Sequence, residues 1–280
     1  MNIQEQILIW FEGGRNEGLT LFFTSVTILA ENLFLVMLLA VLYWCIDKVK
    51  AKRLAWFVLF SAVGNGIVKN IVRMPRPYEI GVVKPLRVET ATSYSFPSGH
   101  TQAVTSFWTG SMIILKTKVS VILGCVMILL TAFSRLYLGV HWPMDVLGAI
   151  GFGLVFVYFG NQIMDEETTV NEWHLLATGV GCFLVLILNL DEDLCESMAG
   201  LFGLCMGCYI EQKNIHFMNN KSLKNNVLRC LIGVLGAVGI YFVFSKLFLD
   251  LKIVSMIKNI VILLWVVAGA PYVFKNIAKI

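Results

Sequence analysis

The chain has 280 residues, of which 58% are hydrophobic and only 14% are charged, and its mean hydropathy is +0.77. A soluble domain carries about 25% charged residues, so this composition excludes an ordinary soluble protein and favours a chain that crosses a membrane several times. The formal net charge of +4 is small, and the basic residues form no stripe interleaved with aromatic residues. We therefore expect the membrane bilayer as a partner, and no nucleic acid.

Nine apolar stretches of the sequence are predicted to span the membrane. Backbone polar groups in lipid must be satisfied within the chain, and long, solidly apolar runs indicate helices rather than the alternating strands of a barrel. The sequence therefore predicts an all-α transmembrane bundle, the first helix of which is interrupted by Glu31 and Asn32. The predicted spans are residues 24–46, 54–72, 101–115, 119–132, 146–163, 173–190, 197–210, 227–247 and 253–274.

Three regions follow from the order of these stretches. Residues 1–23 are expected to form an amphipathic helix in the membrane interface, because Ile3, Ile7, Trp10 and Phe11 recur at helical spacing. Residues 24–163 form a core of five spans that contains the polar motifs described below. Residues 164–280 supply additional transmembrane helices.

The placement of lysine and arginine predicts the orientation of the bundle. Basic residues cluster in the loops after the first, third and seventh spans and in the carboxy-terminal tail. With nine spans these segments all lie on one side, and loops rich in lysine and arginine remain cytoplasmic. We therefore expect a multi-pass protein of the plasma membrane with an external amino terminus. The polar motifs then lie at the opposite, extracytoplasmic face, so the site faces outside.

Three short polar strings interrupt this apolar background. Polar side chains near lipid are costly and are usually retained for function. Cations on the external face run against the charge bias, so a bound anion explains them better than topology does. The strings are Lys69 with Arg76 and Pro77, then Pro97-Ser98-Gly99-His100, and then Ser134-Arg135 with His141 and Asp145.

The cations of these strings suit phosphate recognition. Arg76 and Arg135 can each hold two phosphate oxygens with a planar guanidinium, and Lys69 adds a point charge. Pro75 and Pro77 end the helix after Lys69, so we expect Arg76 in a turn. We predict Lys69, Arg76 and Arg135 as phosphate-binding residues.

Ser98, Gly99 and His100 open the third span. Serine is a common N-cap, glycine lets the backbone approach a ligand, and the free amides at a helix start attract an anion. A simple helix cap is the alternative, but it would not explain a histidine at the membrane edge. We predict Ser98 and Gly99 as phosphate-binding residues. His100 is then the general acid for the leaving group, and later the base for water.

His141 and Asp145 are four residues apart around Pro143, in the expected first turn of the fifth span. The carboxylate can orient one imidazole nitrogen and leave the other to attack phosphorus. We predict His141 as the nucleophile and Asp145 as its orienting residue. Such a pair could also be structural or half of a metal site. The other histidines, His174 and His216, fall on the cytoplasmic side, so we predict no metal.

Together the strings resemble the three signature motifs of the type 2 phosphatidic acid phosphatase superfamily, with the same spacing within each motif. The resemblance covers roughly residues 20–162. It implies a helical membrane core, a phosphohistidine intermediate on His141 and no metal or other cofactor. It also implies the phosphate-binding and acid–base roles named above. The nine-span layout with an external amino terminus is also similar to the glucose-6-phosphatase branch.

The leading hypothesis is an integral membrane phosphatase that hydrolyses a lipid phosphate or diphosphate, such as undecaprenyl diphosphate, phosphatidylglycerophosphate or phosphatidate. One alternative is a phosphatase of soluble phosphomonoesters such as glucose 6-phosphate, which needs an aqueous funnel instead of a lateral opening between helices. An alternative of another class is a phosphate or phospholipid transporter, which would place its polar residues at the bilayer midplane.

Glu31 is a further functional candidate, because ionisable side chains are costly inside a membrane. It either lines the substrate cavity or marks the outer boundary of a span that begins at Leu33. The sequence leaves both interpretations open.

Overall fold

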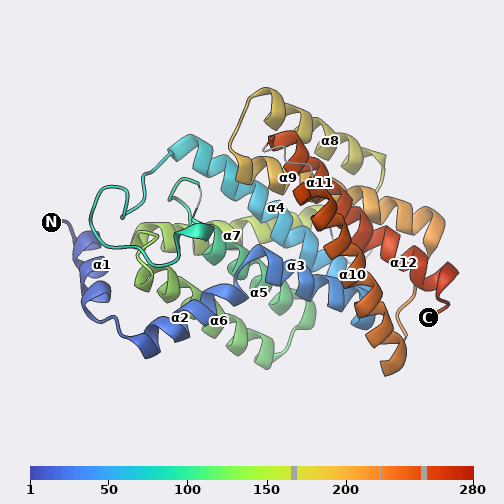
Figure 1. Cartoon of the computed structure of the whole chain (residues 1–280), viewed down its shortest axis with the longest axis horizontal. Coiled ribbons are helices and arrows are strands. Elements are labelled where there is room, and N and C mark those ends of the chain that lie inside the picture. Colours follow the sequence, from blue (N-terminus) through green and yellow to red (C-terminus); the bar gives the residue numbers. More distant parts are fainter. Residues whose placement is uncertain (92, 165–168, 221, 247–250) are drawn as a thin grey trace. The chain divides into compact units, whose positions relative to one another are not determined.

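The computed structural model describes residues 1–91, 93–164, 169–220, 222–246 and 251–280. The regular secondary structure in these ranges is helical, and none of their residues forms a β-strand (Figure 1). The predicted all-α class is therefore confirmed. Packing divides the chain into two compact units. Unit 1 comprises Met1–Leu35 and Phe60–Ile163, and unit 2 comprises Val36–Leu59 and Met164–Ile280. The predicted three-part division of the chain stays a prediction.

Unit 1 is built around α5 (Gly99–Leu115), which packs against both α6 (Lys118–Tyr137) and α7 (Pro143–Ile163). The amino-terminal helices α1 (Ile3–Gly13) and α2 (Glu17–Leu29) pack on α6. Unit 1 also contains the start of α3 (Asn32–Val41), the end of α4 (Lys48–Val72) and the 3-10 helix η2 (Val88–Thr90).

Glycines allow α5 to lie close to both of its neighbours. A Cβ atom built at Gly153 of α7 would lie 2.8 Å from the Thr105 side chain of α5. A Cβ at Gly124 of α6 would lie 2.2 Å from Met112 Cε and 3.2 Å from Trp108 Cβ, both on α5. Small residues at such crossings let helix backbones approach each other in a membrane. This packing fixes the amino end of α5 beside α7, where the candidate site is found.

Side-chain caps explain where several helices begin. Asn2 and Glu5 form a capping box at the start of α1, with both hydrogen bonds at 3.0 Å. Asn16 caps α2 by accepting from the Leu19 amide at 2.9 Å, and Thr117 caps α6 by accepting from the Ser120 amide at 3.1 Å. The helices therefore extend beyond the predicted apolar stretches into polar flanking residues.

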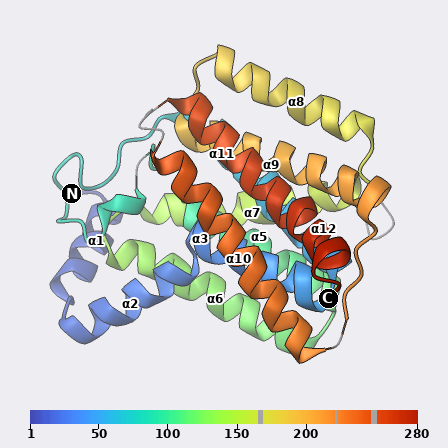
Figure 2. The ribbon, with the colours of Figure 1, turned by 45° about the vertical axis from the view of Figure 1, so that its right-hand side comes forward.

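Unit 2 is formed mainly by α8 (Glu172–Ile187), α9 (Glu192–Ile210), α10 (Leu223–Lys246) and α11 (Lys252–Leu264). α11 packs along α9 and α10 (Figure 2). α11 continues through η4 (Trp265–Gly269), α12 (Ala270–Tyr272) and η5 (Val273–Ile277). The π-helical turns η1 (Leu42–Ile46) and η3 (Glu211–Ile215) extend α3 and α9. In the interior of this unit, Trp44 Nε1 donates to the Val266 carbonyl at 2.7 Å.

Among the described residues, five helices are long and apolar enough to cross a membrane. They are Lys48–Val72, Lys118–Tyr137, Pro143–Ile163, Leu223–Lys246 and Lys252–Ile277, and the bent pair Glu17–Leu29 with Asn32–Ile46 makes up to six. The other predicted spans correspond to α5, α8 and α9. α5 and α8 are shorter, with 17 and 16 residues, and α9 begins with two acidic residues. The nine-span layout stays a prediction, and residue 247 of the eighth predicted span lies outside the described residues.

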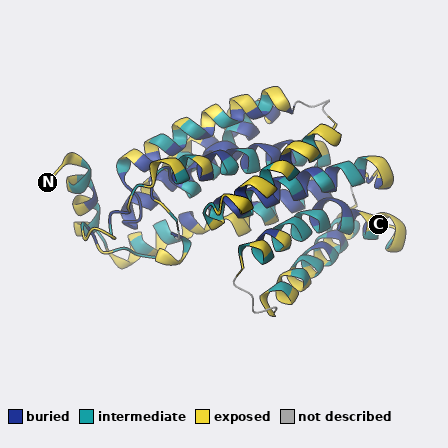
Figure 3. Cartoon of the chain, turned by 90° about the horizontal axis from the view of Figure 1, so that it is seen from above, coloured by how far each residue is buried: buried dark blue, intermediate teal, exposed yellow. Residues whose placement is uncertain are grey.

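Large apolar side chains face outward on several helices. Exposed residues follow one side of many helices in Figure 3, and buried residues follow the other. Such surfaces are unusual in soluble proteins and suit contact with lipid. On α6 the exposed apolar residues are Val119, Val121, Ile122, Leu123, Val126, Leu129 and Phe133.

Replacing Gly153 by alanine is expected to destabilise unit 1, because the new methyl group would lie 2.8 Å from Thr105 in a close helix crossing. We expect a cost of about 1–3 kcal/mol, measured as a lower thermal unfolding midpoint of the purified protein in detergent. Gly151→Ala is the matched control on the same helix, because no neighbouring atom lies within 4 Å of its Cβ position. Equal midpoints for the two variants would contradict this packing.

Candidate active site

The predicted site residues all belong to unit 1, where the three polar strings converge. The helix ends supply most of them, and two loops supply the rest. They come from the last turn of α4 (Lys69), the loop after it (Arg76), the start of α5 (Ser98, Gly99 and His100), the last turn of α6 (Arg135), the loop before α7 (His141) and the first turn of α7 (Asp145).

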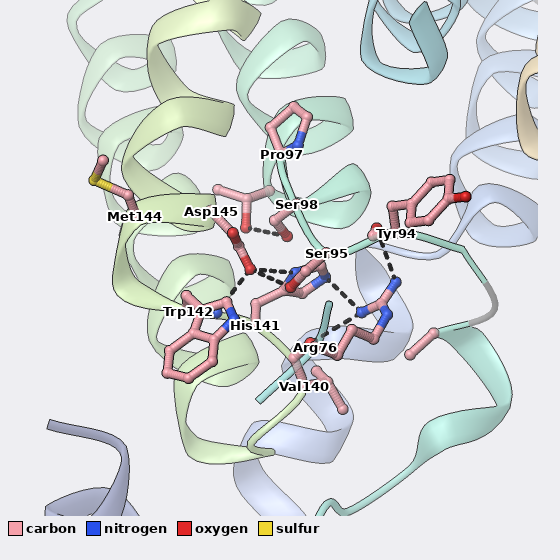
Figure 4. Close-up of polar contacts among 12 residues, drawn as sticks. Arg76, Tyr94, Ser95, Pro97, Ser98, Val140, His141, Trp142, Met144 and Asp145 are labelled. Atoms are coloured by element: carbon pink, nitrogen blue, oxygen red, sulfur yellow. Dashed lines mark hydrogen bonds and ion pairs between the residues drawn. The ribbon is translucent and has the colours of Figure 1, made fainter. Parts of the chain in front are cut away.

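One oxygen of the Asp145 carboxylate organises the histidine. Asp145 Oδ2 lies 3.2 Å from His141 Nδ1, and it accepts hydrogen bonds from Ser95 Oγ at 2.5 Å and from the Trp142 amide at 2.7 Å (Figure 4). The His141 side chain is 2% exposed and the Asp145 side chain is fully buried. Because an ionised carboxylate can only accept, His141 Nδ1 carries the proton and Nε2 keeps its electron pair.

The position of Arg76 agrees with this tautomer. Arg76 Nη1 lies 3.3 Å from His141 Nε2, and a guanidinium can only donate, so Nε2 must accept. The same side chain donates to the carbonyl of Val140 at 2.9 Å (Figure 4). It also donates to the carbonyl of Ser93 at 2.7 Å. These backbone contacts hold the guanidinium in place. The electron pair of Nε2 therefore faces a fixed cation.

The loop that carries His141 is held from both sides. Gly139 has a φ of +71°, which favours glycine, and a Cβ at this position would lie 2.8 Å from Arg15 Nη2. Trp142 Nε1 donates to the Pro75 carbonyl at 3.0 Å, which joins this loop to the first polar string. Pro143 then begins α7.

The His141 imidazole is neutral in this setting. Burial lowers the pKa of His141 well below its usual range, and the positive charges of Arg76, Arg135 and Lys69 lower this pKa further. A neutral imidazole has the electron pair that attack on phosphorus requires. At neutral pH no proton therefore blocks the electron pair of His141 Nε2.

Ser93 joins the two cations of the first string. Lys69 Nζ donates to Ser93 Oγ at 2.6 Å, and Arg76 Nε donates to the carbonyl of the same residue. Both cations are buried, with 4% exposure for Lys69 and 2% for Arg76. Beneath them, Asn65 Nδ2 donates to Gln102 Oε1 at 2.8 Å and links the end of α4 to α5.

Arg135 is fully buried and only partly paired. Its Nη1 donates to Thr27 Oγ1 at 2.8 Å, but its Nε and Nη2 find no hydrogen-bond partner in the part of the chain that the structure describes. The buried Nε2 of His100 also has no hydrogen-bond partner among the described residues. An unpaired buried donor costs about 1–3 kcal/mol. The two Arg135 nitrogens therefore indicate an acceptor that the described residues do not supply, and a phosphate oxygen would satisfy them.

Ser98 occupies the N-cap position of α5, but its hydroxyl makes no capping hydrogen bond. Instead the hydroxyl shares a hydrogen bond of 3.1 Å with Thr101 Oγ1. The Ser98 amide donates to the Asp145 carbonyl, also at 3.1 Å. The prediction of Ser98 as the N-cap is therefore right in position. It is wrong in hydrogen bonding, because the Ser98 hydroxyl bonds to the Thr101 hydroxyl and not to a backbone amide of α5. The contact with Asp145 joins the second string to the third.

Three residues that the sequence did not single out support the site. Ser95 donates to Asp145, Ser93 contacts Lys69 and Arg76, and Thr27 holds Arg135. Thr27 is a polar residue in an apolar helix, which is a signal that a sequence can give. The two serines lie in a loop without periodicity, so no pattern distinguishes them from other loop residues.

No group of three His, Cys, Asp or Glu side chains that could hold a metal ion is found among the described residues. The side chain that contacts His141 Nε2 is the Arg76 guanidinium, which is a hydrogen-bond donor and not a metal ligand. This contact suits an anion better than a metal ion.

Two segments of the chain match known protein families. Residues 50–169 match the PAP2 superfamily, and residues 195–279 match the transmembrane extension of PAP2 superfamily phosphatases. The chain is 34% identical over 109 residues to an undecaprenyl-diphosphatase of Sulfolobus acidocaldarius, and this alignment covers 38% of this chain and 51% of the relative. It is 32% identical over 130 residues to human sphingosine-1-phosphate phosphatase 2, and this alignment covers 44% of this chain and 32% of the relative. The alignments thus span about half and a third of these relatives.

A solved structure shares the fold. The crystal structure of a PAP2-type phosphatidylglycerolphosphate phosphatase from Bacillus subtilis matches with a TM-score of 0.51 and 23% sequence identity. The matched region covers 60% of this chain and 87% of the chain in that crystal structure. All eight predicted site residues lie within the segment that matches the superfamily. The matched extension and the apolar helices identify a multi-pass membrane protein. The chain belongs to the PAP2 superfamily and carries the transmembrane extension of that superfamily.

Proposed function

We propose that this protein is a membrane phosphatase that cleaves a lipid phosphate or diphosphate through a phosphohistidine on His141. The observation that carries this proposal is the Arg76 guanidinium at the lone pair of His141 Nε2, together with the unpaired donors of the buried Arg135. Arg76 faces that nitrogen at 3.3 Å, and Arg135 has two donor nitrogens without a partner among the described residues. A phosphoryl group bound there would satisfy the donors and present its phosphorus to the nucleophile.

The first chemical step transfers the phosphoryl group to the protein. His141 Nε2 forms a bond to phosphorus, and the bond from phosphorus to the leaving oxygen breaks. The electron pair of that bond stays on the leaving oxygen, which takes a proton from His100. Asp145 stabilises the positive charge that develops on the imidazole, because its Oδ2 accepts from Nδ1.

The second step releases inorganic phosphate. A water molecule attacks phosphorus and gives a proton to His100, while the bond to His141 Nε2 breaks and its electron pair returns to the nitrogen. The phosphoryl oxygens stay bound to Lys69, Arg76 and Arg135 throughout. This cycle leaves the protein unchanged.

Charge neutralisation is assigned to side chains instead of a metal ion. Lys69, Arg76 and Arg135 are buried together, and their electrostatic field repels a divalent cation. A guanidinium holds phosphate oxygens in a bidentate way, which supplies the orientation that a metal ion supplies elsewhere. We therefore propose metal-independent hydrolysis.

The substrate class rests on the membrane setting and on the relatives. Relatives are named for undecaprenyl diphosphate and for sphingosine 1-phosphate, both of which carry the phosphate on a lipid. We propose a lipid substrate and a site at the extracytoplasmic face of a nine-span bundle, as the placement of lysine and arginine predicts.

Purified protein in detergent is expected to release phosphate equally well with and without EDTA. The assay compares undecaprenyl diphosphate, phosphatidylglycerophosphate, phosphatidate and glucose 6-phosphate. His141→Asn should lower kcat by about 10³-fold or more, because it removes the attacking nitrogen. His216→Asn is the matched control, since His216 is exposed in unit 2 and has the positive φ that asparagine tolerates.

Three outcomes of this assay would overturn the proposal. They are activity that EDTA abolishes, turnover by His141→Asn near the level of the unmodified protein, and release from glucose 6-phosphate alone.

Impermeant thiol reagents test the orientation. A cysteine at Ile80, which is 57% exposed in the loop between the first two strings, should react in intact cells. Lys118 is exposed at the start of α6, just after the carboxy-terminal end of α5. A cysteine at this position should react only after the membrane is permeabilised. Both variants are made with Cys125 replaced by alanine, because that native cysteine is exposed. The reverse labelling pattern would place the site on the cytoplasmic side.

A further inference from the structure

Glu31 and Arg87 form an ion pair that belongs to none of the three strings. Arg87 Nη2 donates to Glu31 Oε1 at 2.5 Å. The two side chains are 28% and 22% exposed, so the pair is largely shielded from solvent. Arg87 Nε is buried and finds no hydrogen-bond partner among the described residues. The guanidinium therefore has a donor that its carboxylate partner does not use.

The backbone holds this pair beside the candidate site. Glu31 follows α2 one turn after Thr27, the residue that accepts from Arg135. Arg87 follows Leu86, the amide of which donates to the Leu138 carbonyl at 2.8 Å in the loop that carries His141. Both partners are thus tied to segments that position the catalytic residues.

The charges of the pair act on the site. The positive charges that act on His100 are those of Arg135, Lys69, Arg76 and Arg87. The charges that act on Arg135 include those of Arg76, Glu31 and Arg87. His100 is the proposed proton donor for the leaving oxygen, so the charge of Arg87 acts on the side chain that is proposed to face this oxygen.

A charge count shows what Arg87 could add. When His100 is neutral, the three cations of the strings and the Asp145 carboxylate carry a net charge of +2, which matches a phosphate dianion. The Glu31–Arg87 pair is neutral as it stands. A substrate with a second phosphate brings further negative charge on the leaving-group side, and Arg87 is the cation that the pair could release to meet it.

We propose that Arg87 binds the leaving-group phosphate of a lipid diphosphate, and that it exchanges the Glu31 carboxylate for this phosphate when the substrate binds. This inference rests on the proposed phosphatase function. His141 Nε2 bonds to the terminal phosphorus, and the bond from that phosphorus to the bridging oxygen breaks. The electron pair stays on the bridging oxygen, which remains part of a lipid monophosphate. Arg87 neutralises the charge that forms there.

The identity of the leaving group explains why such a residue matters. A monoester leaves as an alkoxide and requires a proton from His100. A diphosphate leaves as a phosphate monoester, with a second pKa of about 6, so charge neutralisation contributes more than proton transfer does. A planar guanidinium fits this role, because it can hold two oxygens of one phosphate.

The test compares two substrates with the same lipid tail, farnesyl diphosphate and farnesyl monophosphate. Arg87→Met should lower kcat/KM for the diphosphate by about 10- to 100-fold, the equivalent of one lost hydrogen bond to a charged group. The value for the monophosphate should stay within about twofold. Lys84→Met is the matched control, because Lys84 is an exposed cation in the same loop. It should leave both substrates unchanged.

Two further variants separate substrate binding from a structural role. Arg87→Lys keeps the charge and should restore part of the activity on the diphosphate. Glu31→Gln removes the competing carboxylate and should retain the preference for the diphosphate. If the pair were only a structural tie, Glu31→Gln and Arg87→Met would impair both substrates alike. That result would overturn the proposal.

The unmodified protein distinguishes this inference from the proposed function. Cleavage of the monophosphate but not of the diphosphate would overturn the role of Arg87 and leave the phosphatase assignment in place. Cleavage of neither farnesyl substrate, nor of any lipid in the wider panel, would overturn both.

Discussion

The hydrogen bonds to one oxygen of Asp145 are the interaction on which the site depends. This oxygen accepts from Ser95, from the Trp142 amide and from His141 Nδ1. The first two contacts fix the carboxylate, and the carboxylate fixes the imidazole tautomer. Because the proton is then on Nδ1, the electron pair of Nε2 faces Arg76 and the buried cations. One buried carboxylate thus sets the tautomer and the orientation of the imidazole that we propose as the nucleophile.

The same burial destabilises the folded protein when no anion pairs with the buried cations. Arg135 is fully buried, and its second and third donor nitrogens have no partner among the described residues. A buried cation in this state is stabilised by an anion. The surrounding helices hold these cations in place. Their close crossings at Gly153 and Gly124 leave α5 little freedom to shift relative to α6 and α7.

The sequence singles out the motif residues because their signal is local, and the structure places all of them in unit 1. Polar residues at fixed spacing in an apolar chain identify Lys69, His141 and the others without knowledge of the fold. The supporting contacts are not local. Thr27 meets Arg135 and Glu31 meets Arg87 across 108 and 56 positions of sequence, and no spacing rule links such residues. The sequence predicts the helix limits less accurately than the motif residues. Capping residues such as Asn16 and Thr117 start helices in polar sequence, before the apolar stretches begin.

A covalent phosphoryl group on His141 Nε2 is the central claim, and trapping it is the most direct test. The protein is mixed with a substrate that is labelled in its transferred phosphate, quenched with alkali within milliseconds and digested to peptides. The label should map to the peptide that contains His141, with phosphorus on Nε2, and it should be absent from His141→Asn. Label on Nδ1 or on another residue would contradict the proposed geometry. Turnover without any labelled protein would contradict the covalent mechanism.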